Sequence, residues 1–351
     1  MGKSGSGKST LLKCLIRQDI IDKHSLCFFD PHGDAVQEIY NGLSAHDRKR
    51  TLYFDLTDPK LSLSYNPLRS VPPAKRSLVA SSVLDVFKRL WKSAWGMKME
   101  HILRMVLLTL LDQKQADFTS INRILLEEPY RHHCIANIRS KEVRLFWQRE
   151  FPLLKASDIS PILSKTGAFL SHDIVRKILI ENKQKISLRY LMDNNSILLI
   201  NLAKGAVGND VANTIGSLLL TTIANASFSR IDTPPEFRKP FFLYLDEFQS
   251  FTNAELIGDL LSESRKFRMG LILSNQFMAQ LDDKVRLSVI GNVGNLVSFR
   301  LGIKDSKLME QQFYPIFKAT DFTHLPRGSV YLRMMINHRP SRPFSAEILP
   351  W

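Results

Sequence analysis

The N-terminal stretch of this chain reads Gly2-Lys3-Ser4-Gly5-Ser6-Gly7-Lys8-Ser9-Thr10, and it decides the fold. Its first eight residues fit the pattern G-x-x-x-x-G-K-[ST] of a phosphate-binding loop (P-loop) at every fixed position. Such a loop curls its backbone N–H groups around phosphate, and the helix predicted to follow adds a favourable dipole. We therefore expect these nine residues to bind a nucleotide, with Lys8 reaching its β- and γ-phosphates and Ser9 coordinating Mg²⁺.

A P-loop normally follows a central strand, but only Met1 precedes Gly2 here. We therefore expect that this first strand is missing, and that the true start lies upstream or the chain is a fragment. Further along, the apolar run 25–29 is closed by Asp30-Pro31-His32-Gly33, which predicts a strand ending in a turn. Asp30 and His32 either approach the nucleotide or only shape this turn.

Two adjacent carboxylates provide a second anchor for a nucleotide site. The apolar run Phe241–Leu245 predicts a buried strand, and Asp246-Glu247 follows it directly, as in a Walker B element. In such a site Asp246 would hold Mg²⁺, and Glu247 would orient or deprotonate the attacking water.

A glutamine and a basic cluster follow these carboxylates. The run 270–273 predicts another strand, which places Gln276 where it could sense the γ-phosphate. Arg265-Lys266-Phe267-Arg268 stands at the end of a predicted helix. Its cations either complement the helix C-terminus or supply an arginine finger to the site of a neighbouring subunit.

The order of the elements predicts an α/β fold with a mostly parallel central sheet. Strand-like runs alternate with helical stretches on both sides of a long segment in which apolar residues recur at helical spacing. We expect residues 1–71 and 189–351 to form a nucleotide-binding domain, and residues 72–188 to form an all-α insertion domain.

Composition excludes several classes of protein. The chain has 351 residues, 44% hydrophobic and 23% charged, which is typical of globular proteins and excludes disordered and fibrous ones. The net charge of +14 favours a polyanionic partner, either nucleic acid or an anionic membrane surface. Three scattered cysteines have no zinc-ligand or redox spacing. No continuous apolar run reaches the 18 to 20 or so residues of a membrane span, and no signal-peptide pattern is present.

Taken together, these motifs resemble those of the HerA and FtsK superfamily of hexameric DNA-pumping ATPases, most closely the coupling proteins of type IV secretion and conjugation systems. The resemblance extends over nearly the whole chain. It rests on the P-loop, the 29–34 turn, residues 95–104, 200–205 and 262–266, the Asp246-Glu247 pair, the 274–276 segment and residues 341–344.

The resemblance implies a RecA-like P-loop NTPase that uses ATP and Mg²⁺ to translocate DNA. In the family, an arginine 19 residues after the Walker B aspartate acts in the neighbouring subunit, and a glutamine 30 residues after it senses the nucleotide. Arg265 and Gln276 have these spacings from Asp246. The expected catalytic residues are therefore Lys8, Glu247, Arg265 and Gln276, and the expected metal ligands are Ser9 and Asp246.

The resemblance also implies partners and a location. We expect non-specific binding of single- or double-stranded DNA, a homo-oligomeric ring that is a hexamer, and contacts with a relaxase and secretion-channel components. We expect a cytoplasmic location, at the inner membrane face if an upstream segment or partners attach the chain there. The alternatives are a HerA-type repair helicase, a protein-secretion motor, and a truncated, non-catalytic DNA-binding remnant.

Two groups of side chains in the helical segment have open roles. Its basic residues either face DNA phosphates or form a solvated helix face; they are Lys88, Arg89, Lys92, Lys98 and Arg104. Its aromatic residues fit a helix core better than a base-stacking platform; they are Trp91, Trp95, Phe146 and Trp147.

Overall fold

The computed structural model describes residues 1–58, 63–69, 71–180, 184–185, 187–252 and 254–349. It forms two compact units. The sheet unit comprises Met1–Asp55, Ser187–Gly205 and Ile223–Trp351, and the helical unit comprises Leu56–Ile186 and Ala206–Thr222. The boundaries between the nucleotide-binding domain and the all-α insertion domain, at residues 71/72 and 188/189, stay predictions.

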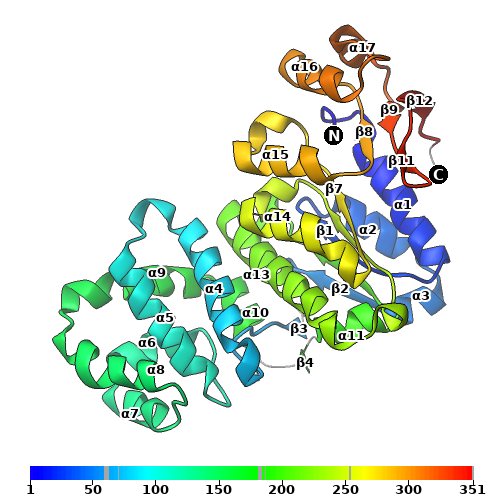
Figure 1. The fold of residues 1–351 in the computed structure, drawn as a ribbon. Coiled ribbons are helices and arrows are strands. Elements are labelled where there is room, and N and C mark those ends of the chain that lie inside the picture. The colour runs from blue at the N-terminus through cyan, green and yellow to red at the C-terminus, as the bar shows by residue number, and fades with distance from the viewer. Residues whose placement is uncertain (59–62, 70, 181–183, 186, 253, 350–351) are drawn as a thin grey trace. The chain divides into compact units, whose positions relative to one another are not determined.

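The sheet unit is built on five parallel strands in the order β2-β5-β1-β6-β7 (Figure 1). Their bounds are Thr51–Asp55 for β2, Ile197–Asn201 for β5, Ser25–Asp30 for β1, Phe241–Leu245 for β6 and Met269–Leu273 for β7. Every residue of β1 and β5 is buried, as expected of central strands covered on both faces. All carboxyl ends therefore meet at one edge of the sheet.

Helices pack their apolar faces onto this sheet. From α1 (Lys8–Ile21), the side chains of Leu12, Ile16 and Ile20 join the core cluster around β1 and β5. In α2 (Asp34–Asn41), Val36 and Ile39 do the same. Further helices of this unit are α3 (Ala45–Lys49), α11 (Leu188–Asp193), α14 (Ala254–Glu263) and α15 (Asp283–Asn292); the last two lie side by side (Figure 1).

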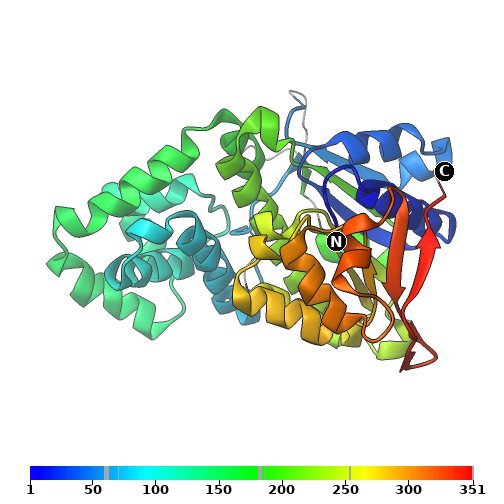
Figure 2. The same cartoon turned by 90° about the horizontal axis from the view of Figure 1, so that it is seen from above.

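A second, antiparallel sheet completes the sheet unit, with strand order β12-β9-β8. Its strands are β8 (Leu296–Ser298), β9 (Ser329–Arg333) and β12 (Phe344–Glu347), and Figure 2 shows the last two side by side. The remaining elements are α16 (Ile303–Gln312), α17 (Ala319–His324), β10 (Met335–Ile336) and β11 (Arg339–Pro340).

The first two residues of the chain, Met1 and Gly2, lie between the two sheets. The amino group of Met1 donates to the Val297 carbonyl at 2.8 Å, and Phe299 N donates to the Met1 carbonyl at 2.9 Å. On the other side, Gly2 N donates to the Asn275 carbonyl at 3.3 Å. This segment therefore bridges β8 and the end of β7.

The helical unit is organised around α5 (Met97–Leu111), whose Ile102, Leu103, Val106 and Leu107 are fully buried. Its other helices are α4 (Arg76–Leu90), α6 (Thr119–Leu126), α7 (Glu128–Ala136), α8 (Lys141–Leu145), α9 (Ala156–Leu170) and α10 (Asp173–Leu179). Short helical turns cover Pro73–Lys75, Lys92–Ala94, Phe146–Glu150 and Phe151–Leu153, and two-residue strands β3 (Leu63–Ser64) and β4 (Gln184–Lys185) pair in parallel.

Two helices run from one unit into the other. They are α12 (Lys204–Val207) and α13 (Asn209–Phe228). By length and composition, Asn209–Asp232 is the one helical stretch among the described residues that could cross a membrane, and 67% of its apolar window is buried in the structure. It is not a continuous apolar run, because polar side chains interrupt it. Burial of this extent is typical of a core helix.

Candidate functional site

The P-loop has the geometry of an anion-binding loop. Gly7 adopts φ = +116°, a left-handed conformation that glycine enters without strain, and α1 begins at the next residue. No side chain caps this helix. The first backbone N–H groups of an α-helix have no intrahelical acceptor, so those of Lys8, Ser9 and Thr10 are available to an anion.

The Lys8 side chain lies within the loop. Its Nζ donates to the carbonyls of Gly2 at 2.5 Å and Lys3 at 2.9 Å. Burial lowers the pKa of Lys8, while the charges of Asp246 and Glu247 oppose this shift. The P-loop lysine therefore interacts electrostatically with the two Walker B carboxylates.

Asp246 is a buried carboxylate at the end of β6. Burial raises its pKa, and the nearby charges of Asp30 and Glu247 act in the same direction. Its Oδ1 accepts a hydrogen bond from Glu247 N at 3.1 Å. Such a carboxylate is stabilised by a cation, and this environment suits the expected metal ligand.

Glu247 is held by three side chains from different elements. Lys204 Nζ donates to its Oε2 at 2.5 Å, Gln276 Nε2 donates to its Oε1 at 2.6 Å, and His32 Nε2 lies 3.2 Å from the same Oε1. Although burial acts in the opposite direction, the bonds from Lys204 and His32 lower the pKa of Glu247. Glu247 is therefore an anchored carboxylate.

Gln276 connects this carboxylate to the P-loop. Ser4 Oγ donates to Gln276 Oε1 at 3.3 Å, while the amide nitrogen of the same glutamine bonds Glu247. Because Gln276 is bonded to both Ser4 of the P-loop and Glu247, it is suited to respond to a ligand bound in the P-loop. Its predicted role as a nucleotide sensor stays a prediction.

Arg265 is not part of this cluster. It lies in the turn Ser264–Phe267, before the start of β7, whereas Gln276 follows the carboxyl end of the same strand. The Arg265 side chain is exposed and makes no hydrogen bond or ion pair with any described residue. A role in its own site is therefore not favoured, and its role in a neighbouring subunit stays a prediction.

The structure separates the two alternatives for the 30–33 turn. The Asp30 carboxylate accepts hydrogen bonds from the backbone N–H groups of His32, Ala35 and Val36 at 2.9, 2.9 and 3.1 Å. Asp30 therefore shapes the turn and the start of α2. His32 instead reaches the candidate site through Glu247.

Sequence reasoning did not assign a role to Lys204. This residue follows the buried strand β5, whose last residue is Asn201. The available signal was its position: polar residues after neighbouring parallel strands meet at the carboxyl edge of the sheet.

The described residues offer few protein ligands for a metal. They contain no group of three or more His, Cys, Asp or Glu side chains that could hold one. A Mg²⁺ ion coordinated mainly by phosphate oxygens and water needs only one or two protein ligands. Ser9, which is exposed, and the buried Asp246 suit this kind of site.

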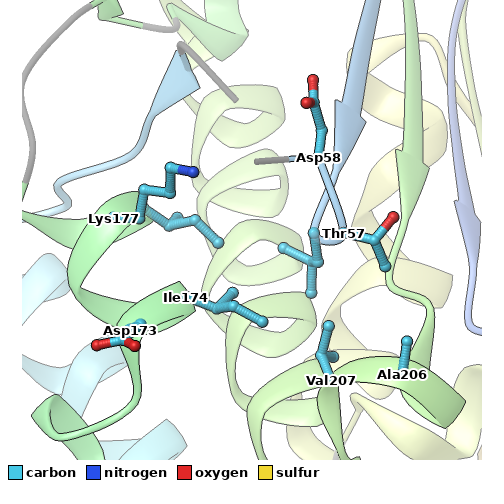
Figure 3. A pocket seen from close by; sticks show the side chains of 9 residues that line it. Thr57, Asp58, Asp173, Ile174, Lys177, Ala206 and Val207 are labelled. Atoms are coloured by element: carbon cyan, nitrogen blue, oxygen red, sulfur yellow. The ribbon is translucent and has the colours of Figure 1, made fainter. Parts of the chain in front are cut away.

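The helical unit contains a separate cavity of about 330 Å³ (Figure 3). None of the predicted site residues lines it. Its walls come from the segment after β2, from α10 and from the stretch around α12; they are Leu56, Thr57, Asp58, Asp173, Ile174, Lys177, Ile178, Ala206 and Val207.

Comparison with known proteins gives one matching family. Residues 1–286 match the family described as "Type IV secretion-system coupling protein DNA-binding domain". No curated protein matches the chain.

Solved structures share the fold. The conjugative coupling protein TrwBdeltaN70, in its unbound monoclinic form, has a TM-score of 0.73 at 17% identity, over 100% of this chain and 84% of the other. TrwB in complex with ADP and Mg²⁺ has a TM-score of 0.70 at 17% identity with the same coverage. VirB4 of Thermoanaerobacter pseudethanolicus has a TM-score of 0.61 at 13% identity, over 99% of this chain and 88% of the other. The expected α/β, RecA-like P-loop fold is confirmed.

Proposed function

This chain belongs to the family of type IV secretion-system coupling protein DNA-binding domains, and from that premise we propose that it hydrolyses ATP to move DNA through a ring of identical subunits. One observation carries the proposal. The P-loop, the Asp246-Glu247 pair and Gln276 converge at the carboxyl edge of one parallel sheet, where Gln276 bonds both Ser4 and Glu247.

The residues of the loop bind the triphosphate. The N–H groups at the start of α1 and the Lys8 ammonium meet its negative charge, and Ser9 and Asp246 hold Mg²⁺. When bound, Mg²⁺ neutralises charge that develops on the phosphate oxygens. The complexes of TrwB with an ATP analogue and with ADP and Mg²⁺ support this choice of ligands.

Glu247 acts on the attacking water. Its carboxylate accepts the water proton while the water oxygen forms a bond to the γ-phosphorus and the bond to ADP breaks. Gln276 then reports the loss of the γ-phosphate through its bond to Ser4. Arg265 completes the site of the adjacent subunit in a hexameric ring, which agrees with its exposed side chain that has no partner in the described part of the chain.

DNA is the proposed cargo. The net charge of +14 suits non-specific contacts to single- or double-stranded DNA, and the description of the matching family includes DNA binding. In the helical unit, the exposed side chains of Lys88 and Lys98 pair with Glu100 and Asp158, and we propose that they exchange these partners for DNA phosphates. Phe146 and Trp147 are buried in its core and are not a stacking platform. A relaxase and channel components at the inner membrane face are the further partners we propose.

The test measures ATP hydrolysis with and without single- and double-stranded DNA, for the wild type and Lys8→Ala. We expect DNA to stimulate turnover, with stimulation that weakens steeply as salt rises. Lys8→Ala should lose measurable turnover because its positive charge meets the β- and γ-phosphates. The matched control is Lys13→Ala, which removes a partly buried lysine of the same helix that pairs with Glu38.

Other outcomes identify other functions. A rate of ATP hydrolysis that DNA does not change at any salt concentration would indicate a protein-secretion motor. DNA binding without turnover would indicate a non-catalytic DNA-binding protein. Unchanged turnover in Lys8→Ala would refute the site assignment.

A further inference from the structure

The ion pair between Lys204 and Glu247 joins two loops at the carboxyl edge of the sheet. Lys204 follows β5 and Glu247 follows β6, and these strands lie on either side of β1. The Nζ–Oε2 distance is 2.5 Å, and the Glu247 side chain is 9% exposed. A carboxylate this buried needs a charged partner, which Lys204 supplies.

Both ends of this contact have a strained backbone. Ala203, directly before Lys204, has φ = +39°, and Glu247 itself has φ = +44°, ψ = +48°. For residues other than glycine this left-handed region is unfavourable, because Cβ comes too close to the following carbonyl oxygen. Such conformations persist only where surrounding contacts fix them, and they concentrate at functional sites.

Hydrogen bonds fix the loop that carries Lys204. Ala203 N donates to Asn201 Oδ1 at 3.0 Å, and Lys204 N donates to the Pro31 carbonyl at 2.9 Å. The Asn201 amide in turn donates to Asp55 Oδ2 at 3.0 Å. Because this strained loop is anchored at several points, it presents Lys204 to Glu247 in one defined conformation.

Lys204 is the dominant of the three partners of Glu247. Gln276 is neutral, and His32 has a half-exposed side chain 3.2 Å from the carboxylate. Lys204 alone combines a full positive charge with a short contact and a largely buried side chain. It also engages Oε2, whereas both other partners engage Oε1.

We propose that Lys204 is a positioning residue of the ATPase site: it holds the Glu247 carboxylate in the orientation needed to act on the attacking water, and it does not itself contact the nucleotide. This inference rests on the proposed function. It predicts that Lys204 affects the chemical step through Glu247 and leaves nucleotide binding almost unchanged.

The first experiment compares Lys204→Ala with Lys204→Arg and Lys13→Ala. The Lys13–Glu38 pair is a matched control because its distance is also 2.5 Å and its lysine is similarly exposed, 21% against 23%. We expect Lys204→Ala to lower kcat by about 10- to 100-fold, at or below the lower limit of the roughly 10²- to 10⁴-fold contribution of a general base, with KM changed less than about threefold. Lys204→Arg should restore part of kcat, and Lys13→Ala should leave it unchanged.

The second experiment does not use activity. Thermal unfolding is measured for the wild type, Lys204→Ala, Glu247→Gln and the double variant, which together form a double-mutant cycle. We expect Lys204→Ala to lower Tm by about 2–6 °C, because it leaves a buried carboxylate unpaired. The same substitution should cost much less in the Glu247→Gln background. Lys204→Gln replaces Lys204→Ala in both experiments if the alanine variant does not fold.

Three outcomes would overturn the inference, and they show whether the proposed function fails as well. If the wild type hydrolyses no ATP, with or without DNA, the proposed function fails and this inference fails with it. If the wild type is active and Lys204→Ala retains its kcat, the inference alone fails. A loss of affinity for a fluorescent ATP analogue as large as the loss of kcat would mean that Lys204 contacts the nucleotide.

Discussion

The carboxyl edge of the sheet and the core of the helical unit are built on different principles. Among the residues that the structure describes, seven other than glycine have a positive φ; all seven lie in the sheet unit and none in the helical unit. Two of the seven are at the Lys204–Glu247 contact: Glu247 is one of its partners, and Ala203 directly precedes the other. At the sheet edge, a strained backbone and charged side chains set the positions of individual atoms.

The helical unit relies instead on packing. Its central helix α5 buries Ile102, Leu103, Val106 and Leu107 completely, with regular helical backbone throughout. Loss of buried apolar volume costs stability in proportion to the cavity left. The comparison teaches that substitutions at the sheet edge should affect the chemistry more than the stability of the fold, and that substitutions in the helical core should do the reverse.

The sharpest test of this separation is Arg265→Ala. We expect kcat to fall by about 10³- to 10⁵-fold, as for other arginine fingers, because the substitution removes a positive charge from the site of the neighbouring subunit. Nucleotide affinity and the unfolding temperature should stay nearly unchanged, since this exposed side chain has no partner among the described residues. Steady-state kinetics, nucleotide titration and thermal unfolding measure these quantities.

The adjacent Lys266 provides the control for Arg265. It is exposed and pairs with Glu263 within the same chain. Lys266→Ala should therefore keep most of the turnover. An equal loss of nucleotide binding in Arg265→Ala would instead point to a role within its own subunit.

A substitution in the helical core should have the opposite profile. We expect Leu107→Ala to lower the free energy of unfolding by about 2–5 kcal/mol, because the buried side chain leaves a cavity. Affinity for a fluorescent ATP analogue should not change, because the P-loop and the Walker B carboxylates belong to the sheet unit. Urea unfolding monitored by circular dichroism gives the first quantity and fluorescence titration the second.

Leu126 is the matched control within the same unit. Its side chain is 65% exposed at the end of α6, so Leu126→Ala should change stability by less than about 0.5 kcal/mol. A parallel loss of stability and nucleotide affinity in Leu107→Ala would mean that the two units are not energetically separate.

The smallest expected effect concerns the strained backbone itself. Ala203→Gly should raise the free energy of unfolding by about 0.5–1 kcal/mol, because glycine adopts φ = +39° without the penalty that Ala203 bears. The same change in the helical unit, Ala80→Gly within α4, should lower stability by about 1 kcal/mol. Urea unfolding of both variants shows whether each substitution raises or lowers the free energy of unfolding. A loss of stability in Ala203→Gly would contradict the strain argument.

Much of the sheet unit could be predicted from local sequence. Continuous apolar runs located β1 and β6, which are central parallel strands with mostly buried residues. The run 270–273 located β7, although this strand lies at an edge of the sheet and most of its residues are only half-buried. The edge strand β2 was missed because Thr51, Leu52 and Tyr53 are only half-buried and carry no such run.

The contacts of the candidate site could be predicted only in part. The P-loop and the Asp246-Glu247 pair follow from motifs with fixed spacing. The partners of Glu247 do not, because they depend on the order in which the strands pair. His32 lies 215 residues from Glu247 in the sequence and Lys204 lies 43 residues away, and no local pattern encodes either contact.

The turn after β1 carries a constraint that reaches the candidate site. A Cβ atom at Gly33 would lie 2.3 Å from Asn201 Oδ1, and Gly33 also has φ = +96°. The atom it would displace is the one that accepts the hydrogen bond from Ala203 N, next to Lys204. In a genetic screen, substitutions at position 33 would therefore group with those of the candidate site, although the P-loop and the Walker B carboxylates lie elsewhere in the sequence. Few substitutions at position 33 are therefore expected to leave the function of the protein unchanged.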